Sequence, residues 1–133
     1  MWHLAKWRRR GEVEYASAEW HESESMKGVR YKLARISLAR RVEITSRVRA
    51  LVAEAEYHMS GGGMLDTIAA AEVEARVNQA YLQCGLLEVR GLRVDGATCS
   101  VAELIERGPE GLCREIAARI RTLCVVSADE RKN

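Results

Sequence analysis

The sequence predicts a mainly α-helical fold: a single small helical domain of about four helices with one or two short β elements. Length and composition support this prediction, since 133 residues is the size of one ordinary domain. Hydrophobic residues make up 47% of the chain and charged residues 30%, which provides enough apolar side chains for a core. In addition, apolar residues recur at helical spacing in three long stretches, and the chain has a single proline, Pro109.

Residues 1–26 are predicted to form a polar, tryptophan-containing leader, followed by one helical domain over residues 27–133. A short strand is expected near the start of this domain, because Val29, Tyr31 and Leu33 occupy every second position. Within the leader, residues 12–20 could pair as a strand, although the Ala-Ser-Ala sequence inside this stretch is poor strand material.

Two long helices are expected next. Ser37 is the predicted N-cap of the first, which runs from Leu38 to about Met59 and ends at Ser60 and the glycines that follow it. Its inward stripe is predicted to contain Leu38, Val42, Thr45, Val48, Val52, Ala55 and Met59. The second helix is predicted from about Leu65 to Cys84, with an inward face made of Ile68, Val73, Val77, Ala80, Tyr81 and Cys84.

The C-terminal third is predicted to begin with a small hairpin, since residues 91–96 have short strand character and contain an Asp-Gly turn. Ser100 and Glu103 have the spacing of a capping box, which indicates a short helix ending near Arg107. The last helix is predicted from Pro109 to about Cys124, because proline is favoured in a first helical turn.

No group of residues has the spacing of a catalytic or metal site, so we predict that the chain is not an enzyme and binds no cofactor or metal. The three histidines are far apart, and the four cysteines, separated by 15, 14 and 11 positions, contain no Cys-x-x-Cys pair. Glu110–Arg114 and Glu115–Arg119 are expected to be ordinary ion pairs of an exposed helix face. The glycine triplet lacks the Lys-Ser/Thr that follows in a P-loop.

The cysteines and the N-terminus predict a cytoplasmic protein of the host cell. Reduced, buried thiols are expected for Cys84, Cys113 and Cys124 on otherwise apolar helix faces, and a disulfide such as Cys84–Cys99 stays open as an alternative. The N-terminal arginines are followed by Gly-Glu-Val-Glu-Tyr instead of the apolar stretch of about 7–15 residues in a secretory signal. No stretch approaches the roughly 18–20 apolar residues of a membrane span, so no membrane partner is expected.

Basic residues are concentrated between Lys27 and Arg49, where Glu43 is the single acid. The candidate partner-binding residues at the strand-to-helix junction in this stretch are Arg30, Tyr31, Lys32, Leu33, Arg35, Arg40 and Arg41. Three interpretations stay open: salt-sensitive binding of nucleic acid phosphates, a solvated face paired with acids of later helices, and docking of an acidic protein.

Three segments carry a resemblance to a known family: GVRYKLARISLARR at 28–41, LRVDG at 92–96 and ELIERGPEGLCREI at 103–116. Over residues 28–124 the chain resembles the tail assembly chaperones of tailed phages and prophages. The resemblance implies a non-enzymatic helper that keeps tail tube and tape measure proteins soluble until the tube polymerises. Its expected contact surfaces are the strand Val29–Leu33 and the apolar stripe of the helix Leu38–Met59. No catalytic residue is carried over.

Two further partners remain open alongside tail tube and tape measure proteins. One is self-association of the chain. The other is nucleic acid, which corresponds to the alternative function: a small nucleic-acid-binding or regulatory helical protein that uses the basic patch at residues 27–49. The third class of function that stays open is an enzyme whose site is assembled from scattered residues.

Overall fold

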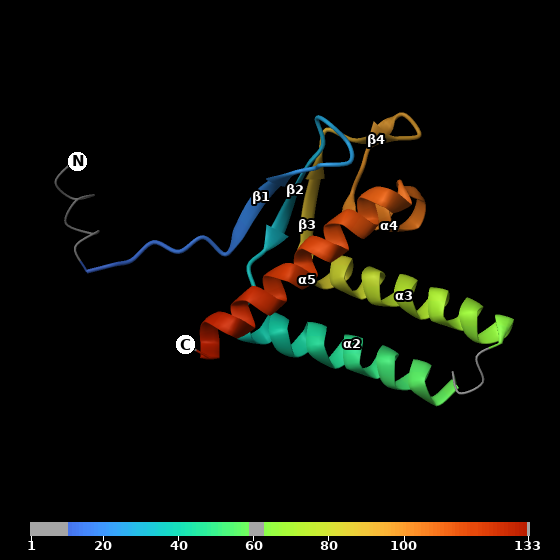
Figure 1. Cartoon of the computed structure of the whole chain (residues 1–133). Coiled ribbons are helices and arrows are strands. Elements are labelled where there is room, and N and C mark those ends of the chain that lie inside the picture. The colour runs from blue at the N-terminus through green and yellow to red at the C-terminus, as the bar shows by residue number, and fades with distance from the viewer. Residues whose placement is uncertain (1–10, 59–62, 133) are drawn as a thin grey trace.

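A computed structural model describes residues 11–58 and 63–132, with main chain alone for residues 58 and 126–132. The elements of this part, shown in Figure 1, are the strands β1 (Ala18–Glu22) and β2 (Arg30–Ala34), the helices α2 (Leu38–His58) and α3 (Met64–Gly85), the strands β3 (Leu86–Arg90), β4 (Arg93–Val94) and β5 (Ala97–Thr98), and the helices α4 (Val101–Arg107) and α5 (Glu110–Lys132). The predicted fold class, mainly helical with short β elements, is confirmed. No helix in the described part is long and apolar enough to cross a membrane.

The main sheet has three antiparallel strands in the order β1-β2-β3. The predicted strand at residues 29–33 is β2, and it is central, with Tyr31 opposite His21 on one side and Val89 on the other. Its main chain therefore pairs with both neighbours and offers no free edge to a partner. The outer strand β3 continues directly from α3 and was not predicted, because the sequence pattern indicated only non-helical structure there.

The predicted domain boundary at residue 26 has to move, because β1 lies inside the segment expected to be a leader. Residues 18–22 pair with β2 along its whole length, from Ala18 opposite Ala34 to Glu22 opposite Arg30. The turn that follows β1 is bonded to α5 through Ser23 and Ser25. The folded domain thus includes at least residues 18–26.

The helices α2 and α3 pack side by side and antiparallel, and Figure 1 shows them extending together away from the sheet. We call this pair the helical arm. Its start agrees with the prediction, since the Ser37 hydroxyl accepts a hydrogen bond from the main-chain N–H of Arg40 at 3.2 Å. The predicted turn at Met59–Gly62 lies outside the described residues.

The predicted inward stripe of α2 is wrong at Leu38, Val42, Thr45 and Val52, which are exposed, and right at Val48, which packs against the core. Its members Leu38, Val42 and Val52 are 75%, 66% and 41% exposed, whereas Ile44 is buried. Alongside Ile44, the partly buried Val48 and Leu51 pack against the core. The reason is that α2 carries apolar residues on more than one face, and its packing against α3 buries the face that contains Ile44, Val48 and Leu51.

In α3 the inward face is confirmed at its C-terminal half, where Val77, Ala80, Tyr81 and Cys84 are buried. The exception is Ile68, which is 58% exposed near the far end of the helical arm. Here α3 is covered only by α2, so part of its apolar surface stays in contact with solvent.

The core lies between the inner face of the sheet and the helices α3, α4 and α5. Its most buried large side chains are Tyr31, Leu33, Leu104, Leu112, Ile116 and Ile120. Helix α5 starts as predicted but runs to Lys132, beyond the predicted end at Cys124. The predicted hairpin is confirmed as β4–β5, with positive φ angles of 52° at Asp95 and 81° at Gly96.

Candidate partner-binding surfaces

The seven residues predicted as a partner-binding patch are distributed over different environments. Alternation along β2 directs Tyr31 and Leu33 into the core, where both have 0% exposure. The prediction that these two side chains contact a partner is therefore wrong. Arg30 and Lys32 project from the opposite face of the same strand.

Arg40 and Arg41 stabilise the fold. The guanidinium of Arg40 donates a 2.6 Å hydrogen bond to the main-chain oxygen of Cys84, near the C-terminal end of α3. That of Arg41 donates a 3.2 Å hydrogen bond to the main-chain oxygen of Cys124 in α5. These contacts fix the start of α2 against α3 and α5.

Arg35 lies just beyond β2. It pairs with Glu19 at 3.4 Å and stands over the ring of Tyr15, 5.7 Å from the ring centroid. These contacts hold the Arg35 side chain near the start of β1. Arg35 therefore contacts a different part of the fold from Arg40 and Arg41.

The outer face of the sheet carries an exposed tryptophan surrounded by cations. Trp20 of β1 is 36% exposed, and its ring centroid lies 5.0 Å from the guanidinium carbon of Arg30 and 4.8 Å from that of Arg90. The ammonium of Lys32 lies 5.9 Å from the same centroid. We call Trp20, Arg30, Lys32 and Arg90 the cation–tryptophan face. Trp20 and Arg90 are not among the residues that the sequence predicts for partner binding, because neither β1 nor β3 was predicted.

Of these cations, Arg90 is paired with Glu88 of its own strand at 2.5 Å. Arg30 and Lys32 make no ion pair with any carboxylate in the described part of the chain. The remaining acid on this face is Glu22, which lies opposite Arg30 in the register. With two acids and three cations, the face is positive by one formal charge.

On the opposite face of the sheet, a carboxylate of α5 is hydrogen-bonded to β2 and to the turn after β1. Glu115 accepts hydrogen bonds from the Tyr31 hydroxyl at 2.8 Å and from the hydroxyls of Ser23 and Ser25 at 3.0 and 2.6 Å. Partial burial alone raises the pKa of Glu115, but the hydrogen bonds from Ser25, Tyr31 and Ser23 outweigh it and lower this pKa to about 2. Burial raises the pKa of the Tyr31 hydroxyl well above its ordinary value, and the bond to Glu115 raises it further.

Arg119 does not pair with Glu115 as the sequence predicted. Its guanidinium contacts Nδ1 of His21 at 3.1 Å and Glu24 at 3.2 Å, and it stands over the Tyr31 ring. The other nitrogen of His21 is 3.1 Å from Glu19. Within the described residues no three His, Cys, Asp or Glu side chains are placed to hold a metal ion. By contrast, the predicted Glu110–Arg114 pair is confirmed at 2.7 Å.

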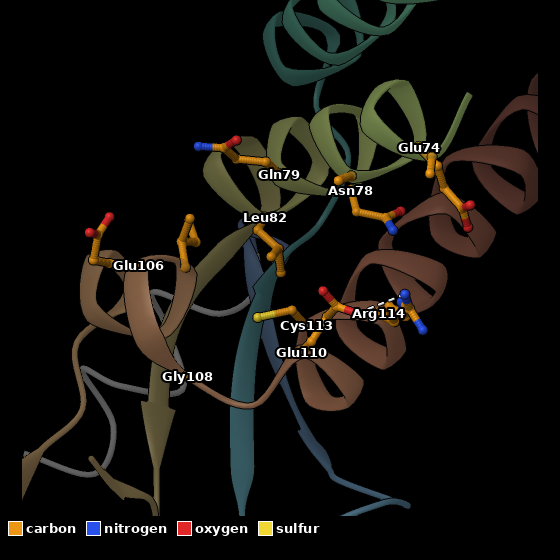
Figure 2. A pocket seen from close by; sticks show the side chains of 12 residues that line it. Glu74, Asn78, Gln79, Leu82, Glu106, Gly108, Glu110, Cys113 and Arg114 are labelled. Atoms are coloured by element: carbon orange, nitrogen blue, oxygen red, sulfur yellow. Dashed lines mark ion pairs between the residues drawn. The ribbon is translucent and has the colours of Figure 1, made fainter. Parts of the chain in front are cut away.

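A cavity of about 510 Å³ opens between α3, α4 and α5. Figure 2 shows Leu82 and Cys113 pointing toward one another from α3 and α5, with polar side chains around them. Among the described residues that line this cavity, the carboxylates are Glu74, Glu106 and Glu110, and the one cation is Arg114. Cys113 has its pKa raised, mainly by burial, so its thiol is a poor nucleophile.

The helical arm is the main apolar surface. The exposed large hydrophobic side chains on it are Leu38, Val42, Val52, Tyr57, Met64, Leu65 and Ile68, which are seven of the twelve such residues described. Leu65 and Met64, at the start of α3, are 82% and 80% exposed. Exposed apolar side chains that gather on one pair of helices make the helical arm a candidate interaction surface.

Comparisons with protein-family models, with curated proteins and with solved structures gave no match.

Proposed function

We propose that this chain is a non-enzymatic assembly helper of the tail assembly chaperone kind, and that it binds tail tube or tape measure protein through the helical arm. The observation that carries the proposal is the set of exposed apolar side chains on α2 and α3. A chaperone must cover an apolar surface of its client reversibly, and a helical pair with uncovered apolar positions has the chemistry to do so.

The exposed positions follow the length of the arm. Leu38 and Val42 lie one helical turn apart at the start of α2, Val52 lies further along it, and Leu65 and Ile68 lie at the start of α3. The hydrophobic effect makes such exposure unfavourable in the isolated protein, and contact with an apolar client would recover part of that free energy.

Within the arm, the exposed apolar residues differ in role from Arg40 and Arg41, which belong to the basic patch first predicted to bind the partner. Arg40 and Arg41 are engaged in contacts that stabilise the fold, while the apolar residues of the arm are exposed. Binding through the arm should accordingly tolerate salt, because apolar contacts are not screened by ions.

The test is co-expression with the tail tube and tape measure proteins of the same phage module, followed by affinity capture at 300 mM salt. We expect the wild-type chain to keep a client soluble and to recover it in stoichiometric amount. The variants Leu65→Lys and Ile68→Lys should leave the client in the pellet.

The matched control is Val13→Lys, which makes the same change at a position 96% exposed and outside the arm. It should behave as the wild type. A client that stays insoluble with the wild-type chain, or one that is captured equally by the arm variants, would overturn the proposal.

A further inference from the structure

The cation–tryptophan face lies on a different side of the fold from the helical arm and does not enter the proposed function. Trp20 and Lys32 are opposite one another in the register of β1 and β2, and Arg90 is opposite Arg30 in that of β2 and β3. One aromatic ring and three cations from three strands are thus brought together on one solvent-facing surface.

The dimensions of this surface are those of a short binding site. Arg30 and Lys32 are two residues apart on β2, which is about 7 Å along a strand. Arg90 stands one strand away, at about 5 Å. A polymer with regularly spaced negative charges and flat apolar groups would meet both the cations and the ring.

We propose that the cation–tryptophan face binds single-stranded nucleic acid. The indole of Trp20 offers a surface on which a base can stack, while Arg30 and Lys32, which have no carboxylate partner in the described part of the chain, neutralise phosphates. An acidic polypeptide would engage the cations equally, but its carboxylates would leave the exposed ring unused. The aromatic ring therefore favours nucleic acid.

The charge of the face sets the strength and salt dependence of binding. If Arg30 and Lys32, the two cations without a carboxylate partner in the described part of the chain, each neutralise one phosphate, the logarithm of the binding constant falls with the logarithm of salt concentration with a slope of about −1.4. Affinity should then drop about 7-fold between 50 and 200 mM salt. Such weak, salt-sensitive binding separates this site from the salt-tolerant contact proposed for the arm.

The experiment is fluorescence anisotropy of a labelled 12-residue oligothymidylate titrated with the full chain at 50 mM salt. Trp20→Ala should weaken binding about tenfold through the loss of stacking. Arg30→Ala should weaken binding and make the salt slope less steep by about 0.7. Because both side chains are exposed, we expect each variant to stay folded, and circular dichroism can confirm this.

Two further variants make the test specific. Glu22→Gln removes an acid from the same face and should strengthen binding, a gain that misfolding would not produce. Arg76→Ala is the matched control: it removes an exposed arginine of α3 that pairs with Glu72 at 2.7 Å, and affinity should be unchanged.

Three results would overturn the proposal. The first is no binding at 50 mM salt. The second is an equal loss of affinity in Arg76→Ala and Arg30→Ala, which would indicate non-specific attraction. The third is equal competition by polyglutamate at the same charge concentration, which would make the face a site for acidic polypeptides. None of these results bears on capture of a client by the arm.

Discussion

The hydroxyl of Tyr31, on the central strand, donates a 2.8 Å hydrogen bond to Oε2 of Glu115 on α5. The same carboxylate accepts hydrogen bonds from the hydroxyls of Ser23 and Ser25 and from the main-chain N–H groups of Glu24 and Ser25. One side chain thus connects the central strand, the turn after β1 and the last helix. We infer that this carboxylate holds the sheet in place on α5.

The Glu115 cluster predicts a loss of stability in acid. Because the pKa of Glu115 is lowered to about 2 in the folded chain, the ionised carboxylate favours the folded state. This contribution is complete above the ordinary carboxyl pKa near 4.5 and is lost as the pH falls toward 2. Glu115→Gln should lower the free energy of unfolding at pH 7 by about 2 kcal/mol and flatten its decline below pH 5.

Urea denaturation at pH 7, 5, 4 and 3 measures this effect. Glu110→Gln is the control, because Glu110 is exposed and paired only with Arg114 on the same helix. An exposed pair of this kind contributes little, so this variant should follow the wild type within about 0.5 kcal/mol. Parallel pH profiles for the wild type and Glu115→Gln would contradict the role assigned to Glu115.

A second prediction concerns two glycines with nearly the same φ angle. Gly91 and Gly96 have φ angles of 82° and 81°, which disfavour any residue with a Cβ. A Cβ at Gly91 would lie 2.2 Å from the main-chain oxygen of Gly28, whereas one at Gly96 would have nothing within 4 Å. Gly96→Ala should therefore lower the free energy of unfolding by about 1 kcal/mol, through backbone strain alone.

Gly91→Ala should cost clearly more, about 3 kcal/mol, because the main chain of the β1–β2 turn must also move. The measurement is the midpoint of urea denaturation for both variants. The midpoints can be compared directly when the free energy of unfolding falls with urea at the same slope in both variants. Equal midpoints would show that the close approach of Gly91 to Gly28 does not constrain the turn.

Local features of the fold could be predicted from the sequence. Ser37, Ser100 and the Asp95-Gly96 turn act through atoms within a few residues, and the structure confirms each of them. Their geometry depends on hydrogen bonds and backbone angles of residues that are close together in the chain.

Features that depend on distant partners could not be predicted. Apolar residues lie on more than one face of α2, and the packing of α3 determines that Ile44 faces inward and Val42 outward. Likewise, β1 exists because β2 pairs with it, and Glu115 reaches residues about 90 positions away. The candidate surfaces follow from these long-range choices, so the sequence located Arg30 and Lys32 but not the role of Trp20.

The different roles of core and arm give a third prediction. Ile116 has 0% exposure in the core, and Ile116→Ala should lower the free energy of unfolding by about 3 kcal/mol or more. Leu65 is 82% exposed at the start of α3, so Leu65→Ala should change it by less than about 0.5 kcal/mol. A large destabilisation by Leu65→Ala in urea would mean that the arm residue serves folding, and not the capture of a client.

The four cysteines give the last prediction. All are free thiols; Cys84 and Cys99 are buried, and Cys113 and Cys124 are partly buried. Burial is the main cause that raises the pKa of each, and Cys84 also donates a 3.0 Å hydrogen bond to Glu43. Because the thiolate is the reactive form, native protein should be alkylated slowly by iodoacetamide at pH 7.5, and the unfolded protein rapidly. Peptide mapping by mass spectrometry should find Cys113 and Cys124 modified first, and early modification of Cys84 would contradict its placement in the core.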